Sequence, residues 1–234
     1  MIYESERKAL DALQVAGAWR TGFDDVATRA LQSAELAPHV REIGLALAFS
    51  GRGMQAEARR HGQRALDAGI TRPQAIEALV TGLLHGGYGI FWENLWIAEN
   101  APEAPRTGDP AAEVATAASV QAYFTDVWGG TLPAWIRLVG EADADLLAAY
   151  YRLRTDALGE GALPKKHKEL LIALMSCVEH YDFGIDVHFR NALAAGATRA
   201  EVIDTVRASV IAGGIVAWVA GCELADKALT DAGK

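Results

Sequence analysis

One stretch of this sequence occurs twice, first at 61–72 and again at 188–199, and this repetition limits the possible folds more than any other feature does. The first copy, HGQRALDAGITR, aligns with the second, HFRNALAAGATR, and seven of the twelve positions are identical. Average composition gives about one identity by chance over that length. The alignment continues without a gap, since Glu42 falls over Glu169. The chain is therefore expected to build one structural unit twice.

Helix is the only strong periodic signal, in Ala-, Leu- and Arg-rich stretches with the period of an α-helix. Gly69 and Gly196 are expected to end helices in the left-handed conformation, and the segments TRPQ at 71–74 and TRAE at 198–201 follow as capping boxes. The predicted helices are 3–17, 23–35, 39–50, 54–68, 72–84, 110–126, 142–157, 165–179, 182–195, 199–212 and 215–230. No stretch alternates in the manner of a strand, so we predict an all-α fold of two tandem helical repeats with no sheet.

The segment NAPEAPRTGDP at 100–110 contains three prolines and a glycine, and it cannot continue a helix. It is the natural linker between the two copies of the repeat. We therefore predict an N-terminal repeat over 1–100, a linker over 101–115 and a C-terminal repeat over 116–234.

Charge and composition exclude several classes of function. A net charge of −8 argues against a nucleic-acid-binding surface, which needs clustered Lys and Arg. The longest apolar run, Ile211–Gly221, is about half of the roughly 18 residues of a membrane span. The first ten residues lack the apolar core of a signal peptide, and Cys177 and Cys222 form no metal or redox motif. We expect a cytoplasmic protein with no metal, nucleic acid or membrane partner.

The repeat also preserves two residue types that can carry chemistry. Glu42 precedes His61 in the first copy, and Glu169 precedes His188 at the same spacing in the second. A carboxylate beside a histidine can hold the imidazole in one tautomer, so that the ring serves as an acid or a base near neutral pH. A buried structural His–Glu pair has the same spacing, and the spacing alone leaves both interpretations open.

The two copies differ beside these histidines. Glu57 lies four residues before His61 and therefore on the same helical face, whereas Gly184 takes that position before His188. The second copy offers Tyr181 instead, seven residues before its histidine. Three titratable groups in the first copy favour His61 as the acid or base. Their proximity is also expected to raise the pKa of one carboxylate.

The pattern KELLIAL…H-x3-ALAAGAT-x2-E at 168–201, preceded by FTDVWGG at 124–130, resembles the carboxymuconolactone decarboxylase and alkyl hydroperoxidase D superfamily. The resemblance implies an all-helical fold that assembles into trimers or hexamers. Two repeats in one chain suggest a homotrimer that imitates a hexamer of single repeats. It also implies cofactor-free decarboxylation or isomerisation of a small carboxylated lactone or enolisable acid, in which a developing dienolate is stabilised and then protonated.

The hydroperoxidase D branch of this superfamily uses a C-x2-C pair together with the Glu and the His. Those two positions hold Tyr181 and Gly184 in the second copy, and Met54 and Glu57 in the first. Disulfide chemistry needs a thiolate and a resolving thiol, so a thiol peroxidase of that kind is not expected. Two alternatives to a carboxy-lyase or isomerase stay open: a peroxidase-related activity by another route, and a non-catalytic helical oligomer that binds or scaffolds a partner.

Overall fold

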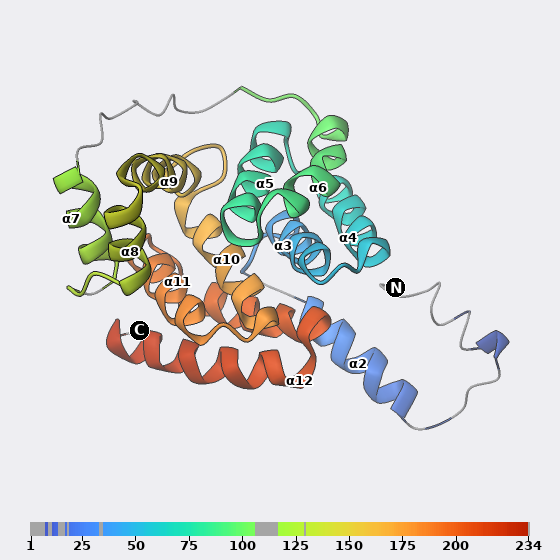
Figure 1. The fold of residues 1–234 in the computed structure, drawn as a ribbon. Coiled ribbons are helices and arrows are strands. Elements are labelled where there is room, and N and C mark those ends of the chain that lie inside the picture. Colours follow the sequence, from blue (N-terminus) through green and yellow to red (C-terminus); the bar gives the residue numbers. More distant parts are fainter. Residues whose placement is uncertain are drawn as a thin grey trace.

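The computed structural model describes residues 8, 11–13, 17, 19–32, 35–105, 117–128 and 130–233, and this part of the chain is mainly helical, with no strand (Figure 1). The all-α prediction is confirmed. The helices are α2 (Trp19–Leu31), α3 (Pro38–Gly51), α4 (Gln55–Asp67), α5 (Arg72–Gly86), α6 (Tyr88–Asn100), α7 (Ala117–Val127), α8 (Ala134–Ala142), α9 (Ala144–Ala157), α10 (Lys165–Glu179), α11 (Asp182–Ala194) and α12 (Arg199–Asp231).

Helix bounds in the two halves of the chain follow the alignment of the repeat. Helices α10, α11 and α12 begin at the positions that align with the first residues of α3, α4 and α5 respectively. Gly214 interrupts α12 with φ 67° and ψ −163°, and the aligned Gly87, which separates α5 from α6, has φ 81° and ψ −173°. The expected left-handed glycines are present too, with φ 84° at Gly69 and 90° at Gly196. Both expected capping boxes form at the starts of α5 and α12.

The helix predictions differ from the structure in several places. Helices α6 and α8 were not expected. The two helices predicted at 199–212 and 215–230 correspond to the parts of α12 before and after Gly214, whose backbone is not helical. Helix α6 is rich in aromatic residues, which are only moderate helix formers, but burial of Ile90 and Ile97 stabilises it. The helix predicted at 3–17 lies almost entirely outside the described residues, as do residues 106–116 of the predicted linker and helix start.

Helices α3 and α10 lie at the centre, and one hydrophobic core runs through both halves of the chain. Gly44 of α3 faces Leu171 of α10 so closely that an added Cβ would lie 2.9 Å from the leucine side chain. These two positions are equivalent in the alignment of the repeat. An ion pair also joins the halves, since Nζ of the buried Lys168 lies 2.8 Å from Oε2 of the partly exposed Glu77. The halves therefore pack as one body around equivalent helices.

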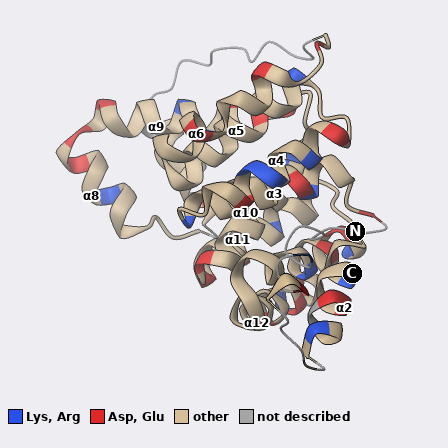
Figure 2. Ribbon diagram, turned by 90° about the vertical axis from the view of Figure 1, so that its right-hand side faces the viewer, with Lys and Arg blue, Asp and Glu red and all other residues tan. Residues whose placement is uncertain are grey.

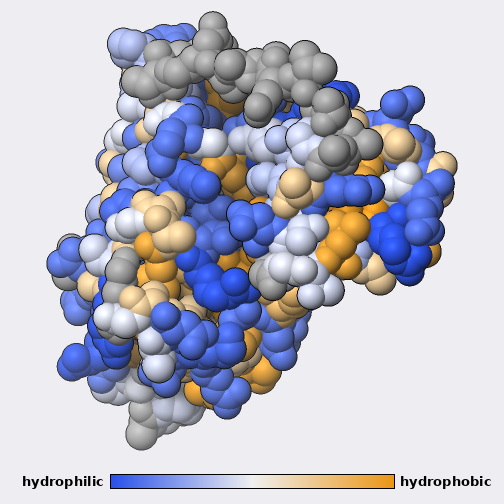
Figure 3. Space-filling model, turned by 90° about the vertical axis from the view of Figure 1, so that its left-hand side faces the viewer, coloured by the Kyte–Doolittle hydropathy of each residue, from blue (hydrophilic) through white to orange (hydrophobic). Residues whose placement is uncertain are grey.

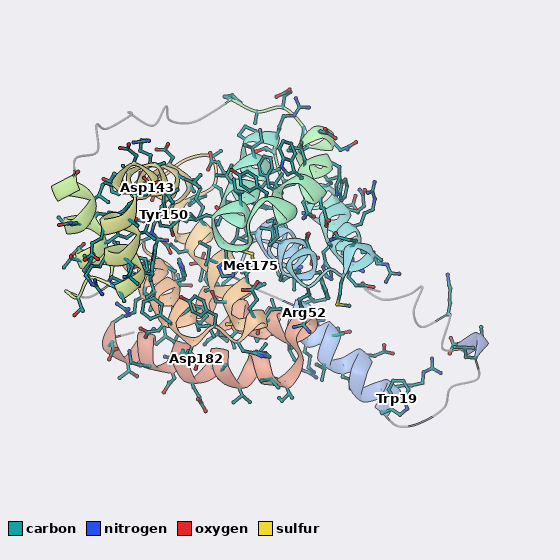
Figure 4. The ribbon with its side chains drawn as sticks, in the orientation of Figure 1. Trp19, Arg52, Asp143, Tyr150, Met175 and Asp182 are labelled. Atoms are coloured by element: carbon teal, nitrogen blue, oxygen red, sulfur yellow. The ribbon has the colours of Figure 1, made fainter. Side chains whose placement is uncertain are left out.

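Helices α7, α8 and α9 form a group at one side of this core, on the left of Figure 1. They enclose a smaller hydrophobic cluster of their own, formed by Val120, Phe124, Ile136, Leu147 and Tyr151. Tyr150 and Asp143, labelled in Figure 4, both belong to the α9 region of this group. Figure 3 views the molecule from this side and shows apolar surface between hydrophilic patches. The group covers one end of α11, and this position matters for the site described below.

Helix α12 contains a longer apolar stretch than was expected from the sequence. By length and composition alone it is long and apolar enough to cross a membrane, and 33% of its most apolar stretch is buried inside the protein. The prediction from sequence rested on an uninterrupted apolar run, whereas α12 mixes small residues with apolar ones. The absence of a membrane partner stays a prediction. Acidic and basic residues are spread over the helices, α12 included, and Figure 2 marks them in red and blue.

Candidate active site

In the first half of the chain the structure brings Glu42 and His61 together. Oε2 of Glu42, on α3, lies 2.7 Å from Nδ1 of His61, on α4. The imidazole is completely buried (0% exposed) and stacks on Phe49 at 5.2 Å between ring centroids. Arg41 donates two hydrogen bonds to the other oxygen of Glu42. This pair lies inside the packed core.

Glu57 does not join this pair, although sequence spacing placed it on the face of His61. Its carboxylate accepts hydrogen bonds from Arg60 at 3.0 and 3.2 Å. Burial raises the pKa of Glu42, but the hydrogen bonds and charges of His61 and Arg41 outweigh burial, so that its pKa lies below the ordinary value. The expected rise in a carboxylate pKa therefore does not occur at Glu42, because Arg41 supplies positive charge and Glu57 lies elsewhere.

In the second half Glu169 and His188 form the equivalent pair, at 2.6 Å between Oε2 and Nδ1. A carboxylate only accepts, so Nδ1–H is the donor and Nε2 carries the lone pair. Burial lowers the pKa of His188 and outweighs the opposing effect of Glu169, while the charges of Arg154 and His85 lower it further. His188 is therefore a neutral base near pH 7.

The second pair differs from the first because His188 lines a cavity of about 160 Å³. The walls come from both halves of the chain, through α5, and from α8, α9, α10, α11 and the end of α7. Tyr181 also lines this cavity, so the structure brings together His188, Glu169 and Tyr181 of the predicted residues. The other lining residues are Leu84, His85, Trp128, Trp135, Tyr150, Arg154, Ile172, Phe183, Gly184 and Val187.

Besides Glu169 and His188, another imidazole–carboxylate pair lies at the same cavity. This pair was not predicted from the sequence. Nε2 of His85, on α5, lies 3.0 Å from Oε2 of Glu179 at the end of α10. The pair joins the two halves of the chain. Neither residue has a counterpart in the repeat, since Ala212 aligns with His85 and Arg52 aligns with Glu179. A search of the sequence for titratable residues at positions where the two copies differ could have identified His85 and Glu179.

Arg154 of α9 is a further residue that sequence reasoning missed. It lines the cavity of His188 and also a neighbouring cavity of about 420 Å³, which Glu169 borders. Its guanidinium carbon lies 5.1 Å from the centroid of the Trp128 ring. The aligned residue in the first half is Ala27, so Arg154 too marks a difference between the copies.

The positions of the thiols and of potential metal ligands complete the description of the site. Cys177 is a buried free thiol, and burial raises its pKa to about 12. The described residues that line the cavity include no cysteine, and the described part of the chain holds no group of three or more His, Cys, Asp or Glu side chains suited to a metal ion. Fold and site together define an all-α protein with buried imidazole–carboxylate pairs, one of them open to an aromatic cavity.

Comparison with known proteins agrees with this class. Residues 144–227 match the model of the carboxymuconolactone decarboxylase family. A solved structure from Burkholderia xenovorans LB400, provisionally named a gamma-carboxymuconolactone decarboxylase subunit, is 25% identical. The match covers 82% of this chain and 78% of that chain, with a TM-score of 0.52.

A second solved structure from the same organism, provisionally named a carboxymuconolactone decarboxylase, is 26% identical. That match covers 50% of this chain and 93% of that chain, with a TM-score of 0.43. None of the curated proteins matches the chain.

Proposed function

We propose that this chain catalyses cofactor-free proton transfer on a small carboxylated lactone or a related enolisable acid, as a decarboxylase or an isomerase. The observation that supports this function is the cavity of about 160 Å³, because two imidazoles, each held by a carboxylate, line it together. The family match and the name of the structural neighbour agree with this substrate class.

His188 would have a different role in each of the two reactions. In isomerisation a base removes a proton from the carbon beside a carbonyl, and the resulting enolate is protonated at another carbon. In decarboxylation the bond to the carboxylate carbon breaks, CO₂ leaves, and the electron pair forms a dienolate that takes a proton. The lowered pKa of His188 makes it a base at neutral pH, so it can start an isomerisation directly. It must first take up a proton to complete a decarboxylation.

The test is turnover of gamma-carboxymuconolactone and of unsaturated lactone acids, followed by NMR and by CO₂ release. We expect His188→Gln to lower the rate by about 10²–10⁴-fold, the usual contribution of a general acid or base. His61→Gln is the matched control, because this residue occupies the equivalent position but lines no described cavity, and it should retain activity per folded molecule. The reverse result, with His61 essential and His188 dispensable, would contradict the proposal.

The pH profile of kcat/KM separates the two reactions. If neutral His188 acts as the base, kcat/KM rises with pH through the lowered pKa, below about 6.5, and then levels off. If protonated His188 is the acid, kcat/KM falls over the same range. A profile that is flat between pH 5 and 8, and equal in wild type and His188→Gln, would remove His188 from the chemistry.

A further inference from the structure

The buried guanidinium of Arg154 lacks the partner that a charge in the interior of a protein needs. Arg154 is 4% exposed, and its Nε is buried without a hydrogen-bond partner. No carboxylate of the described residues forms an ion pair with it. Burial raises the pKa of Tyr123, although a hydrogen bond from Arg154 acts in the opposite direction. This phenol stays neutral and does not balance the charge. Burying a charge is costly unless an opposite charge compensates it.

A second unsatisfied donor lies against the first. Nε1 of Trp128 is also buried with no hydrogen-bond partner among the residues that the structure describes. Its ring lies 5.1 Å from the guanidinium carbon of Arg154, and both side chains line the cavity of His188. Buried donors in native proteins are nearly always paired. Two of them at one cavity therefore indicate that a ligand supplies the acceptor.

The charge and the size of the cavity define that ligand. A guanidinium binds a planar carboxylate through its fork of N–H groups better than it binds any neutral acceptor. A cavity of about 150 Å³ holds benzene in another protein, so the cavity of about 160 Å³ can hold one five- or six-membered ring.

We propose that Arg154 and Trp128 form the subsite that binds a carboxylate of the substrate, with the ring placed between His188 and His85. This assignment rests on the proposed function for its catalytic meaning, but the binding itself does not depend on turnover. An ion pair stabilises the bound carboxylate, and this makes loss of the same group as CO₂ slower. The carboxylate at Arg154 is therefore the anchor that stays in the product, and a decarboxylation at this site would remove a different group.

Binding of benzoate and of its uncharged analogue benzamide tests this subsite, by titration calorimetry on the whole chain. We expect benzoate to bind the wild-type protein and benzamide to bind at least about tenfold more weakly, since hydrogen bonds to a charged group are among the stronger ones. Arg154→Gln should weaken the binding of benzoate by a similar factor. Trp128→Phe, which keeps a ring but loses the N–H, should weaken this binding less. Arg152→Gln, which changes an exposed arginine two residues away on α9, should bind as the wild type does.

The midpoint of thermal unfolding gives a second test. If Arg154 had a purely structural role, its replacement would lower this midpoint. Because Arg154 carries an unpaired buried charge, Arg154→Met should keep or raise the midpoint of thermal unfolding. Equal binding of benzoate and benzamide, unchanged benzoate affinity in Arg154→Gln, or a folded Trp128→Phe protein with full affinity would each overturn the subsite. None of these results depends on the effect of His188→Gln on turnover, so failure of the subsite and failure of the proposed function can be told apart.

Discussion

His61 and His188 occupy equivalent positions and hold equivalent glutamates, yet only His188 borders a described cavity. The shared spacing between glutamate and histidine correctly indicated both pairs. The spacing could not show which histidine is shielded from the cavity, because the shielding side chain belongs to another helix. Phe49 stacks on His61, whereas the equivalent position in the second half is Ser176. The first half therefore has an aromatic ring over its buried histidine, and the second half, in which the histidine borders a cavity, has a serine there instead.

We predict that Glu42→Ala destabilises the fold without a direct effect on chemistry. The substitution leaves the buried Arg41 without its carboxylate and His61 without its acceptor. Removal of one partner from a buried ion pair costs about 3 kcal/mol or more in the free energy of unfolding, which urea denaturation can measure. Activity per folded molecule should stay unchanged. The matched variant Glu169→Ala should lose activity, and equal activity of the two variants would contradict this assignment.

The two cysteines give a second prediction for single residues. Cys177 is buried and its pKa is raised to about 12, whereas Cys222 is exposed. We expect a thiol reagent at pH 8 to modify one thiol per native chain, and the second only after unfolding. The double variant Cys177→Ser/Cys222→Ser should keep its activity. A loss of more than about tenfold, or roughly 1.4 kcal/mol of barrier, in a folded protein would show that a thiol takes part.

At the scale of helices, local rules predicted the elements that form the repeat. Helix α10 begins and ends at the predicted residues 165 and 179, and both capping boxes form. Helices α6 and α8 were missed because tertiary burial stabilises them: Ile97 of α6 packs in the main core, and Ile136 of α8 packs in the cluster with α7 and α9. No local signal in the sequence reveals which distant helix will cover such a residue.

We predict that Gly214→Ala destabilises the kink in α12. Gly214 has φ 67° and ψ −163°, a conformation that is essentially restricted to glycine, and nothing lies within 4 Å of the position of an added Cβ. The cost therefore comes from the backbone alone, at about 1–3 kcal/mol in the free energy of unfolding. Gly89→Ala is the matched control, since this residue has open space inside helix α6 and should gain about 0.5–1 kcal/mol. Equal effects of the two variants would exclude backbone strain.

At the scale of the whole molecule, the repeat in the sequence predicts two units but not how their helices pack together. The shared core and the cavity that combines His85 of one half with His188 of the other both result from packing of α3 and α5 on α10. Contacts between residues that lie far apart in the chain leave no periodic trace. For this reason the sequence predicted the paired glutamates and histidines, and missed the composite site that contains one of the pairs.

Stability should fall as the pH is lowered from 7.5 to 5.5. Burial is the largest cause that lowers the pKa of His39, His167 and His188 in the folded chain. Below their unfolded pKa of about 6.5, the unfolded chain binds more protons than the folded chain, so the free energy of unfolding decreases with falling pH. Each histidine contributes at most about 1.4 kcal/mol per pH unit. Thermal unfolding across this range should show a smaller slope in His39→Gln, and an unchanged slope would contradict the assignment.

The exposed surface leads us to propose a homotrimer. Tyr88 and Trp92 on α6 are exposed, and so are Ile215 and Val219 at the equivalent positions of α12. Exposed apolar patches of this kind usually mark an interface. Two equivalent faces on one chain can meet each other in a closed ring, which agrees with the trimer that the family resemblance implies.

Light scattering at micromolar concentration should therefore give three times the chain mass of 25.0 kDa. Trp92→Glu combined with Val219→Glu should shift the mass to that of one chain, because each substitution places a charge in an apolar contact. Leu146→Glu, at an exposed leucine on α9 away from these helices, is the control and should leave the mass unchanged. A wild-type monomer, or capture of the chain by lipid vesicles through α12, would show that this apolar face serves another purpose.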